Sequence, residues 1–221
     1  IPLTLASETT ILTTSVTNVA HIMEIGPDRN LYMTNGQNVA RITSVTGTTG
    51  NNATFLAFES DVIVRDIISS GSNLVIVGDN NEPSQNATGL HRCFVAFWNM
   101  KSQDLTRIWE INDTGMVGVK SLDTGVIVFG RDAVYKCTID SPPIPLAFGL
   151  SATGDTFQPF LPTTAQQIFI FGAGRVAWGR SSRVLGYGRA FPQQNPIFFS
   201  VFSMEAKSNP GSINSISRIA N

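Results

Sequence analysis

Hydrophobic positions in this chain occur in short, β-branched runs that polar turn residues separate. Residues 62–64 read Val-Ile-Val and residues 126–129 read Val-Ile-Val-Phe, with Gly, Asn, Asp and Ser gathered between such runs. Short β-rich runs bounded by turn residues predict strands. No long stretch keeps the spacing of an amphipathic helix. We therefore expect an all-β chain with almost no helix.

A weak internal repeat organises the predicted strands. Four segments share the order strand, short turn, strand, and each has an apolar run before it and a fourth strand after it. Their anchor residues, Leu31, Leu74, Val126 and Val176, recur at intervals of roughly 45 to 50 residues, and four antiparallel strands per such interval are typical of a propeller blade. We predict a β-propeller-like array of four-stranded antiparallel blades, about four blades plus partial end strands. A β-sandwich or another β fold is the alternative.

The polarity of the strands favours the propeller over the sandwich. Consecutive residues in 62–64 and 126–129 are apolar, which is typical of a strand with both faces covered. In a two-sheet sandwich most strands would alternate between apolar and polar residues. The predicted outer strand at 105–111 is more mixed, as expected for a strand farther from the centre of the array.

The repeat also predicts the domain organisation. Residues 1–18 are N-terminal strands that close a ring or belong to a neighbouring blade, 19–60 are blade 1, 61–113 blade 2, 114–152 blade 3, 163–205 blade 4, and 212–221 the first strand of a further blade. Either the two ends combine into one blade or the chain is cut from a longer one. We expect the longer chain, because the combined blade would lack its second strand.

Composition excludes several classes of protein. Of the 221 residues only 14% are charged and the formal net charge is −1, which argues against a general polyanion-binding protein. Two cysteines and two histidines exclude a disulfide scaffold and a cysteine-rich zinc module. We expect Cys93 and Cys137 to be buried free thiols. No apolar run is long enough for a membrane helix, so we expect no membrane span.

The strongest local charge asymmetry lies in residues 175–189, which contain no acidic residue. The candidate residues for contact with an anion or a partner are Arg175, Arg180, Arg183, Arg189, Trp178 and Tyr187. Cationic side chains interleaved with aromatic rings suit phosphate or an acidic surface. The alternative is a solvated turn with ion pairs to a neighbouring blade or subunit.

Other motifs point to no reaction. Residues 79–82, Asp-Asn-Asn-Glu, form an oxygen-rich insertion that could hold Ca²⁺, although the spacing matches no standard loop and a plain exposed loop is the alternative. His21 and His91 have no sequence partner that indicates a base or a ligand. We expect no catalytic residue, no metal site and no cofactor, and no enzymatic activity.

The segment from Arg175 to Gly188, with residues 195–200 and 209–211, resembles β-propeller modules in virion proteins of tailed bacteriophages, such as tail tubular or nozzle proteins. The resemblance implies a structural module of a ring-shaped assembly in the virion. Other virion subunits and further copies of the chain would be its partners, and DNA would touch it while passing through a channel.

A carbohydrate- or protein-binding propeller of a secreted or surface protein, with an extracellular location, is the second hypothesis. Exposure of Trp98, Trp109 or Trp178 would support it, because sugars stack on aromatic faces. An enzyme is the third hypothesis, and a cleft with two carboxylates or a metal at the propeller axis would support it.

Overall fold

The computed structural model describes most of the chain between residues 22 and 203. The described ranges are 22–34, 36–42, 52–59, 61–80, 93–122, 125–131, 133–148, 168–171, 175–180, 184–189 and 200–203; for 52–55 and from 146 onward they are described at the level of the backbone. The predicted strands in 1–18 and 212–221 lie outside these ranges, as do His21, His91 and Arg183.

Four antiparallel sheets of four strands make up the described fold. Sheet 1 contains β1 (Ile22–Ile25), β2 (Leu31–Thr34), β3 (Val39–Ile42) and β4 (Asn52–Leu56), and sheet 2 contains β5 (Val62–Ser70), β6 (Asn73–Asn80), β7 (Cys93–Trp98) and β8 (Arg107–Ile111). Sheet 3 contains β9 (Met116–Leu122), β10 (Gly125–Gly130), β11 (Ala133–Cys137) and β12 (Ile144–Phe148), and sheet 4 contains β13 (Ile168–Phe171), β14 (Arg175–Arg180), β15 (Val184–Arg189) and β16 (Ser200–Ser203).

Each sheet is a meander in which the strands follow one another in chain order. The described residues form no helix, and therefore none that could cross a membrane. The expectation of an all-β chain is confirmed.

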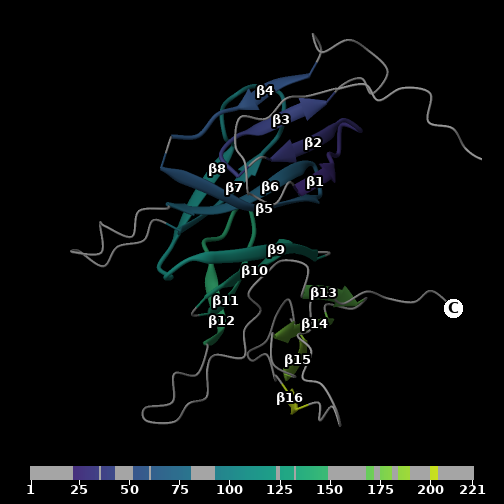
Figure 1. Ribbon diagram of the computed structural model, residues 1–221, viewed down its shortest axis with the longest axis vertical. Helices are drawn as coiled ribbons and strands as arrows, with labels where there is room; N and C mark the ends of the chain where they lie inside the picture. The colour runs from purple at the N-terminus through teal and green to yellow at the C-terminus, as the bar shows by residue number, and fades with distance from the viewer. Residues whose placement is uncertain are drawn as a thin grey trace, which may run out of the picture.

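The sheets stack on one another in chain order, and their first strands form the joints (Figure 1). The strand β1 contacts β5, β5 contacts β9, and β9 contacts β13. Each of these strands is the edge strand of its own sheet. We call the face of a sheet that looks toward the preceding sheet its front, and the opposite face its back.

Sheet 2 shows why its strands are apolar on both faces. Leu74 and Ile76 on β6 belong to a core cluster with Tyr32 and Val39 of sheet 1. The alternate residues of the same strand, such as Val75, belong to a second cluster with residues of sheet 3. Leu74, Val75, Ile76 and Val77 are all fully buried. Both faces of this strand are therefore core, as the polarity pattern predicts.

The structure corrects one boundary of the second unit. Asp79 and Asn80 belong to strand β6, whereas the sequence placed Asp79 at the start of an exposed, oxygen-rich insertion. Both residues are buried. The two polar residues extend the strand because their neighbours on β5 continue the antiparallel pairing, Val62 with Asn80 and Ile63 with Asp79. Glu82 lies outside the described ranges.

Two hairpin glycines differ in how much room surrounds them. Gly125 has φ of +139°, and a Cβ there would lie 2.5 Å from the carbonyl oxygen of Cys137 and 2.9 Å from Cγ2 of Thr138. Gly71 also has a positive φ, +58°, but a Cβ there would meet nothing within 4 Å. Gly125 is therefore required for both its conformation and its close contact, and Gly71 for its conformation alone.

We expect Gly125→Ala to destabilise the protein by roughly 2–4 kcal/mol and Gly71→Ala by about 1 kcal/mol, since the second substitution costs only the left-handed backbone. Urea unfolding of the two variants beside the wild type measures the difference. Equal losses in the two variants would show that the contact with Cys137 does not constrain this hairpin.

Candidate functional site: carboxylates at the joints between sheets

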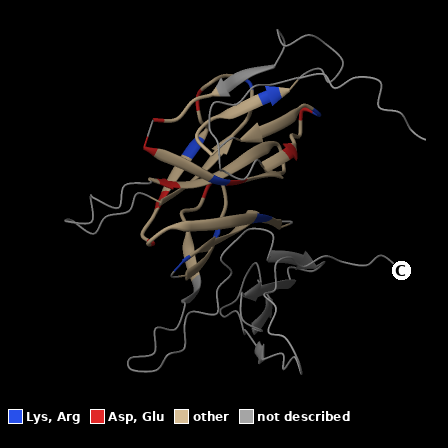
Figure 2. Ribbon diagram, viewed as in Figure 1, with Lys and Arg blue, Asp and Glu red and all other residues tan. Residues whose placement is uncertain are grey.

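Three aspartates are buried in or beside sheet 2, although the described sheets carry few charges (Figure 2). Asp66, Asp79 and Asp113 are 4%, 2% and 5% exposed. Burial of a charged group is costly unless hydrogen bonds or a counter-ion compensate it. These three side chains are therefore the first place to look for chemistry in the described part of the chain.

Asp66 connects sheet 2 to the edge of sheet 3. The pairing of β5 with β6 shifts between Val64 and Asp66, so that Arg65 is the extra residue of a bulge. The amide of Val119 on β9 donates to Oδ2 of Asp66 at 2.9 Å, and the amide of Ile67 donates to Oδ1 at 3.0 Å. The carboxylate thus covers an edge amide of the neighbouring sheet.

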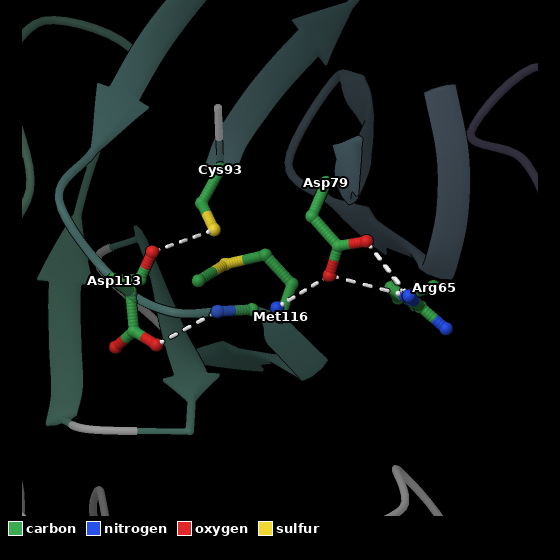
Figure 3. A network of polar contacts seen from close by, with 6 residues as sticks. Arg65, Asp79, Cys93, Asp113 and Met116 are labelled. Carbon is green, nitrogen blue, oxygen red and sulfur yellow. Dashed lines mark hydrogen bonds and ion pairs between the residues drawn. The ribbon is translucent and has the colours of Figure 1, made fainter. Parts of the chain in front are cut away.

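Asp79 makes a second connection at the same joint (Figure 3). The amide of Met116 at the start of β9 donates to Oδ2 of Asp79 at 2.7 Å. The guanidinium of Arg65 donates to the same carboxylate, with Nη2 at 2.8 Å from Oδ1. Asp79 therefore has both an amide partner and a cation, which is how a buried charge is retained in a protein.

Asp113 organises the loop between sheets 2 and 3. Its Oδ1 accepts hydrogen bonds from the amides of Gly115 and Arg131, and its Oδ2 accepts from the amide of Ala133 and the hydroxyl of Tyr135. A Cβ at Gly130 would lie 2.1 Å from Oδ2, so only glycine leaves room for this carboxylate. The thiol of Cys93 donates to the carbonyl oxygen of Asp113 at 3.2 Å.

The joint between sheets 1 and 2 is also connected by a hydrogen bond from a backbone amide to a carboxylate. The amide of Ser69 on β5 donates to Oε1 of Glu24 on β1 at 2.9 Å, and the Ser69 hydroxyl donates to the carbonyl oxygen of Ile25. At both joints, then, a carboxylate of one sheet accepts a hydrogen bond from the first strand of the next. We call Glu24, Asp66 and Asp79 the joint carboxylates.

The pKa values separate these groups by environment. Burial raises the pKa of the Asp66 carboxyl to about 6, although Lys120 and the amides of Val119 and Ile67 favour its charged form. Burial likewise raises the pKa of the Cys93 and Cys137 thiols to about 12. A thiol with so high a pKa is a poor nucleophile at neutral pH. Both cysteines are free and buried, as the sequence predicts.

The joint carboxylates hold sheets together, and the described residues give no sign that they bind a ligand. No cluster of three His, Cys, Asp or Glu suited to a metal ion occurs among the described residues. Asp66 and Asp79 direct their oxygens at backbone amides of β9. This role was not predicted from the sequence. The available signal was the aspartate Asp66 between two apolar runs of one strand, 62–64 and 67–68, in Val62–Ser70.

The cationic cluster predicted from the sequence lies on the hairpin of β14 and β15. Arg175 pairs with Arg189, and Tyr187 pairs with Ala177. Because residues two apart on a strand share a face, this register assigns Arg175, Tyr187 and Arg189 to one face of the hairpin and Trp178 and Arg180 to the other. The contact role of these residues remains a prediction.

Two of the three tryptophans that would support sugar binding if exposed, Trp98 and Trp109, have described side chains, and both contact other residues. Trp98 is fully buried, packs edge-on against Tyr32 at 5.5 Å between ring centroids, and donates its indole N–H to the carbonyl of Ser102. Trp109 is half-buried, with the Arg107 guanidinium 5.0 Å from its ring centroid. The side chain of Trp178 lies outside the described set.

The chain was compared with known proteins by sequence and by structure. No protein-family model matches the chain, and no curated protein matches it. A similar solved structure is described as the crystal structure of a protein of unknown function from Bacteroides caccae, at 10% sequence identity and a TM-score of 0.47. The similarity covers 82% of this chain and 59% of that one, so this chain spans less than two thirds of the length of its relative.

We expect Asp113→Ala to destabilise the protein by roughly 3 kcal/mol or more, because several buried donors lose their acceptor. The control is Asp104→Ala, at an exposed turn residue, for which a change of about 0.5 kcal/mol or less is expected. Thermal and urea unfolding measure both. A similar small loss in the two variants would contradict the organising role of Asp113.

We expect the thiols of Cys93 and Cys137 to be unreactive toward a chromogenic disulfide reagent at pH 8 in the native protein, because both are buried and protonated. Both should react at once after unfolding in guanidinium, which provides the control. Fast reaction of either thiol in the folded protein would contradict the burial described above.

Proposed function

We propose that this chain is a non-enzymatic structural module that works by docking within a larger, ring-shaped assembly, and that the assembly is a virion tail component. The stacking of first strand on first strand in successive sheets supports a propeller-like arrangement of blades. The resemblance of residues 175–188 to tail tubular or nozzle proteins supports the virion setting. In this proposal the partners are other virion subunits and further copies of the chain.

The observation that carries the proposal is the exposed edge of the front of sheet 1 at β1, beside Ala40 and Ile42 of the same face, which are buried. Met23 and Ile25 on β1 are 61% and 65% exposed. The register pairs Met23 with Met33 and Ile25 with Leu31, so these four apolar side chains share that face. We call them the front patch.

Three of the four positions equivalent to the front patch are buried in the next two sheets, whereas the equivalents of Ile25, Ser69 and Ser121, are partly exposed. Leu31 occupies the same place near the start of its strand as Leu74 in sheet 2 and Val126 in sheet 3. Leu74 and Val126 are fully buried against the preceding sheet. In the described residues sheet 1 has no preceding sheet, and exposed apolar patches of this kind mark interaction sites.

The occupant that we propose for the front patch is a second copy of this chain, stacked as one more sheet in the array. Continuity supports this choice, because the same apolar face is covered by another sheet of this chain at both joints described above. A head-to-tail contact of this kind closes into a ring when the rotation per subunit permits it.

The sugar-binding alternative has less support. Stacking on a sugar needs an open aromatic face, and Trp98 has none because it is fully buried. One face of Trp109 carries the Arg107 guanidinium. Binding to a glycan array by a chain that does not self-associate would favour this alternative over the assembly module.

We expect the wild-type chain to sediment as a species several times heavier than its 23.8 kDa monomer. Ile25→Asp should shift it to the monomer, because a charge in an apolar interface is costly to bury. The matched control is Ile108→Asp on β8, where the isoleucine is 51% exposed on another sheet. A wild type that stays monomeric at micromolar concentration, or equal behaviour of the two variants, would overturn the proposed docking.

A further inference from the structure

The joint between sheets 2 and 3 holds two buried carboxylates that differ in one respect. Asp66 and Asp79 are similarly buried, and each accepts a hydrogen bond from an amide of β9. Asp79 also receives the guanidinium of Arg65. The described ion pair at this joint is therefore made by Asp79. The hydrogen bonds described for Asp66 both come from backbone amides.

We propose that Asp66 is a proton-sensitive contact in the joint between sheets 2 and 3, so that mild acidification stabilises the folded chain. Asp79 supplies the ion-paired contact of the same joint. This inference concerns the interior of the chain and stands apart from the proposed docking through the front patch. Neither inference requires the other.

The physical reason is the cost of an ionised carboxylate in this position. Asp66 is a residue of β5, and its side chain is buried at the contact of β5 with β9. In the sheet register it is paired with Val77 of β6. Two amides stabilise the anion, but hydrogen bonds from amides compensate a buried charge less completely than a cation in contact does. A proton on one oxygen removes the charge and leaves the other oxygen able to accept from an amide.

Charged groups on the neighbouring elements act in opposite directions. Lys120, on β9, favours the charged form of Asp66, and Glu24, on β1 of sheet 1, disfavours it. Arg65, the adjacent residue on β5, is engaged with Asp79. The net effect of these groups and of burial is the raised pKa of about 6, within the range of mildly acidic solutions.

The direction of the effect follows from linkage. In the unfolded chain Asp66 ionises with the ordinary pKa of 3.8, whereas in the folded chain it holds its proton up to about 6. Below both of these pKa values Asp66 is protonated in the folded and the unfolded chain, so it adds no pH dependence to the free energy of unfolding. As the pH rises between them the unfolded state is favoured, so stability is lost on going from acid to neutral pH and regained on acidification.

The experiment compares the wild type with Asp66→Asn, which cannot titrate at this position. Chemical denaturation at pH 4.5 and pH 7.5 gives the unfolding equilibrium constant of each protein. The wild-type constant, relative to that of the variant, should be roughly 25-fold larger at pH 7.5 than at pH 4.5. Asp104→Asn removes an exposed carboxylate and should leave the wild-type pH dependence in place.

A second measurement keeps the inference testable if Asp66→Asn folds poorly. In the wild type, the backbone amide of Val119 should change its NMR chemical shift with a midpoint near pH 6, because its acceptor gains a proton there. An amide shift of Val119 that is flat from pH 4.5 to 7.5 would overturn the proposal. So would an unchanged pH dependence in Asp66→Asn.

Discussion

The stack depends on how the edge of each sheet is covered. The first strand of every described sheet is an edge strand, so its outward amides need acceptors once the next sheet packs against it. Glu24 supplies an acceptor to β5, and Asp66 and Asp79 supply acceptors to β9. Apolar burial drives sheets together, and these carboxylates align the first strand of one sheet with the first strand of the next.

The same constraint accounts for the proposed docking surface and for the contacts of the buried carboxylates with backbone amides. A sheet that is apolar on both faces is stable only between two neighbours, as sheet 2 is between sheets 1 and 3. Sheet 1 has such a neighbour on its back, while on its front Met23 and Ile25 are exposed and Leu31 and Met33 are partly exposed. Docking is the function that we propose from the exposed apolar residues Met23 and Ile25.

Much of the fold could be predicted from local pattern. The anchors Leu31, Leu74 and Val126 lie near the start of the second strand of three sheets, and Val176 lies in the second strand of the fourth. The two-sided apolar character of β6 and β10 is a property of consecutive residues, so it is visible without coordinates. The role of Asp79 was not visible in this way. It follows the apolar run of β6 and reads as the start of a polar loop until its neighbours on β5 are known.

The amino-acid sequence by itself determined that this chain forms short antiparallel strands in four repeated units, since strand propensity, turn residues and apolar runs act over a few neighbouring positions. Only the tertiary structure decided which carboxylate meets which amide. Asp66 and Val119 are far apart along the chain, and their contact exists because a bulge at Arg65 and the stacking of two sheets bring them together. Likewise, only the stack shows that Met23 and Ile25 lack the cover that Leu74 and Val126 possess.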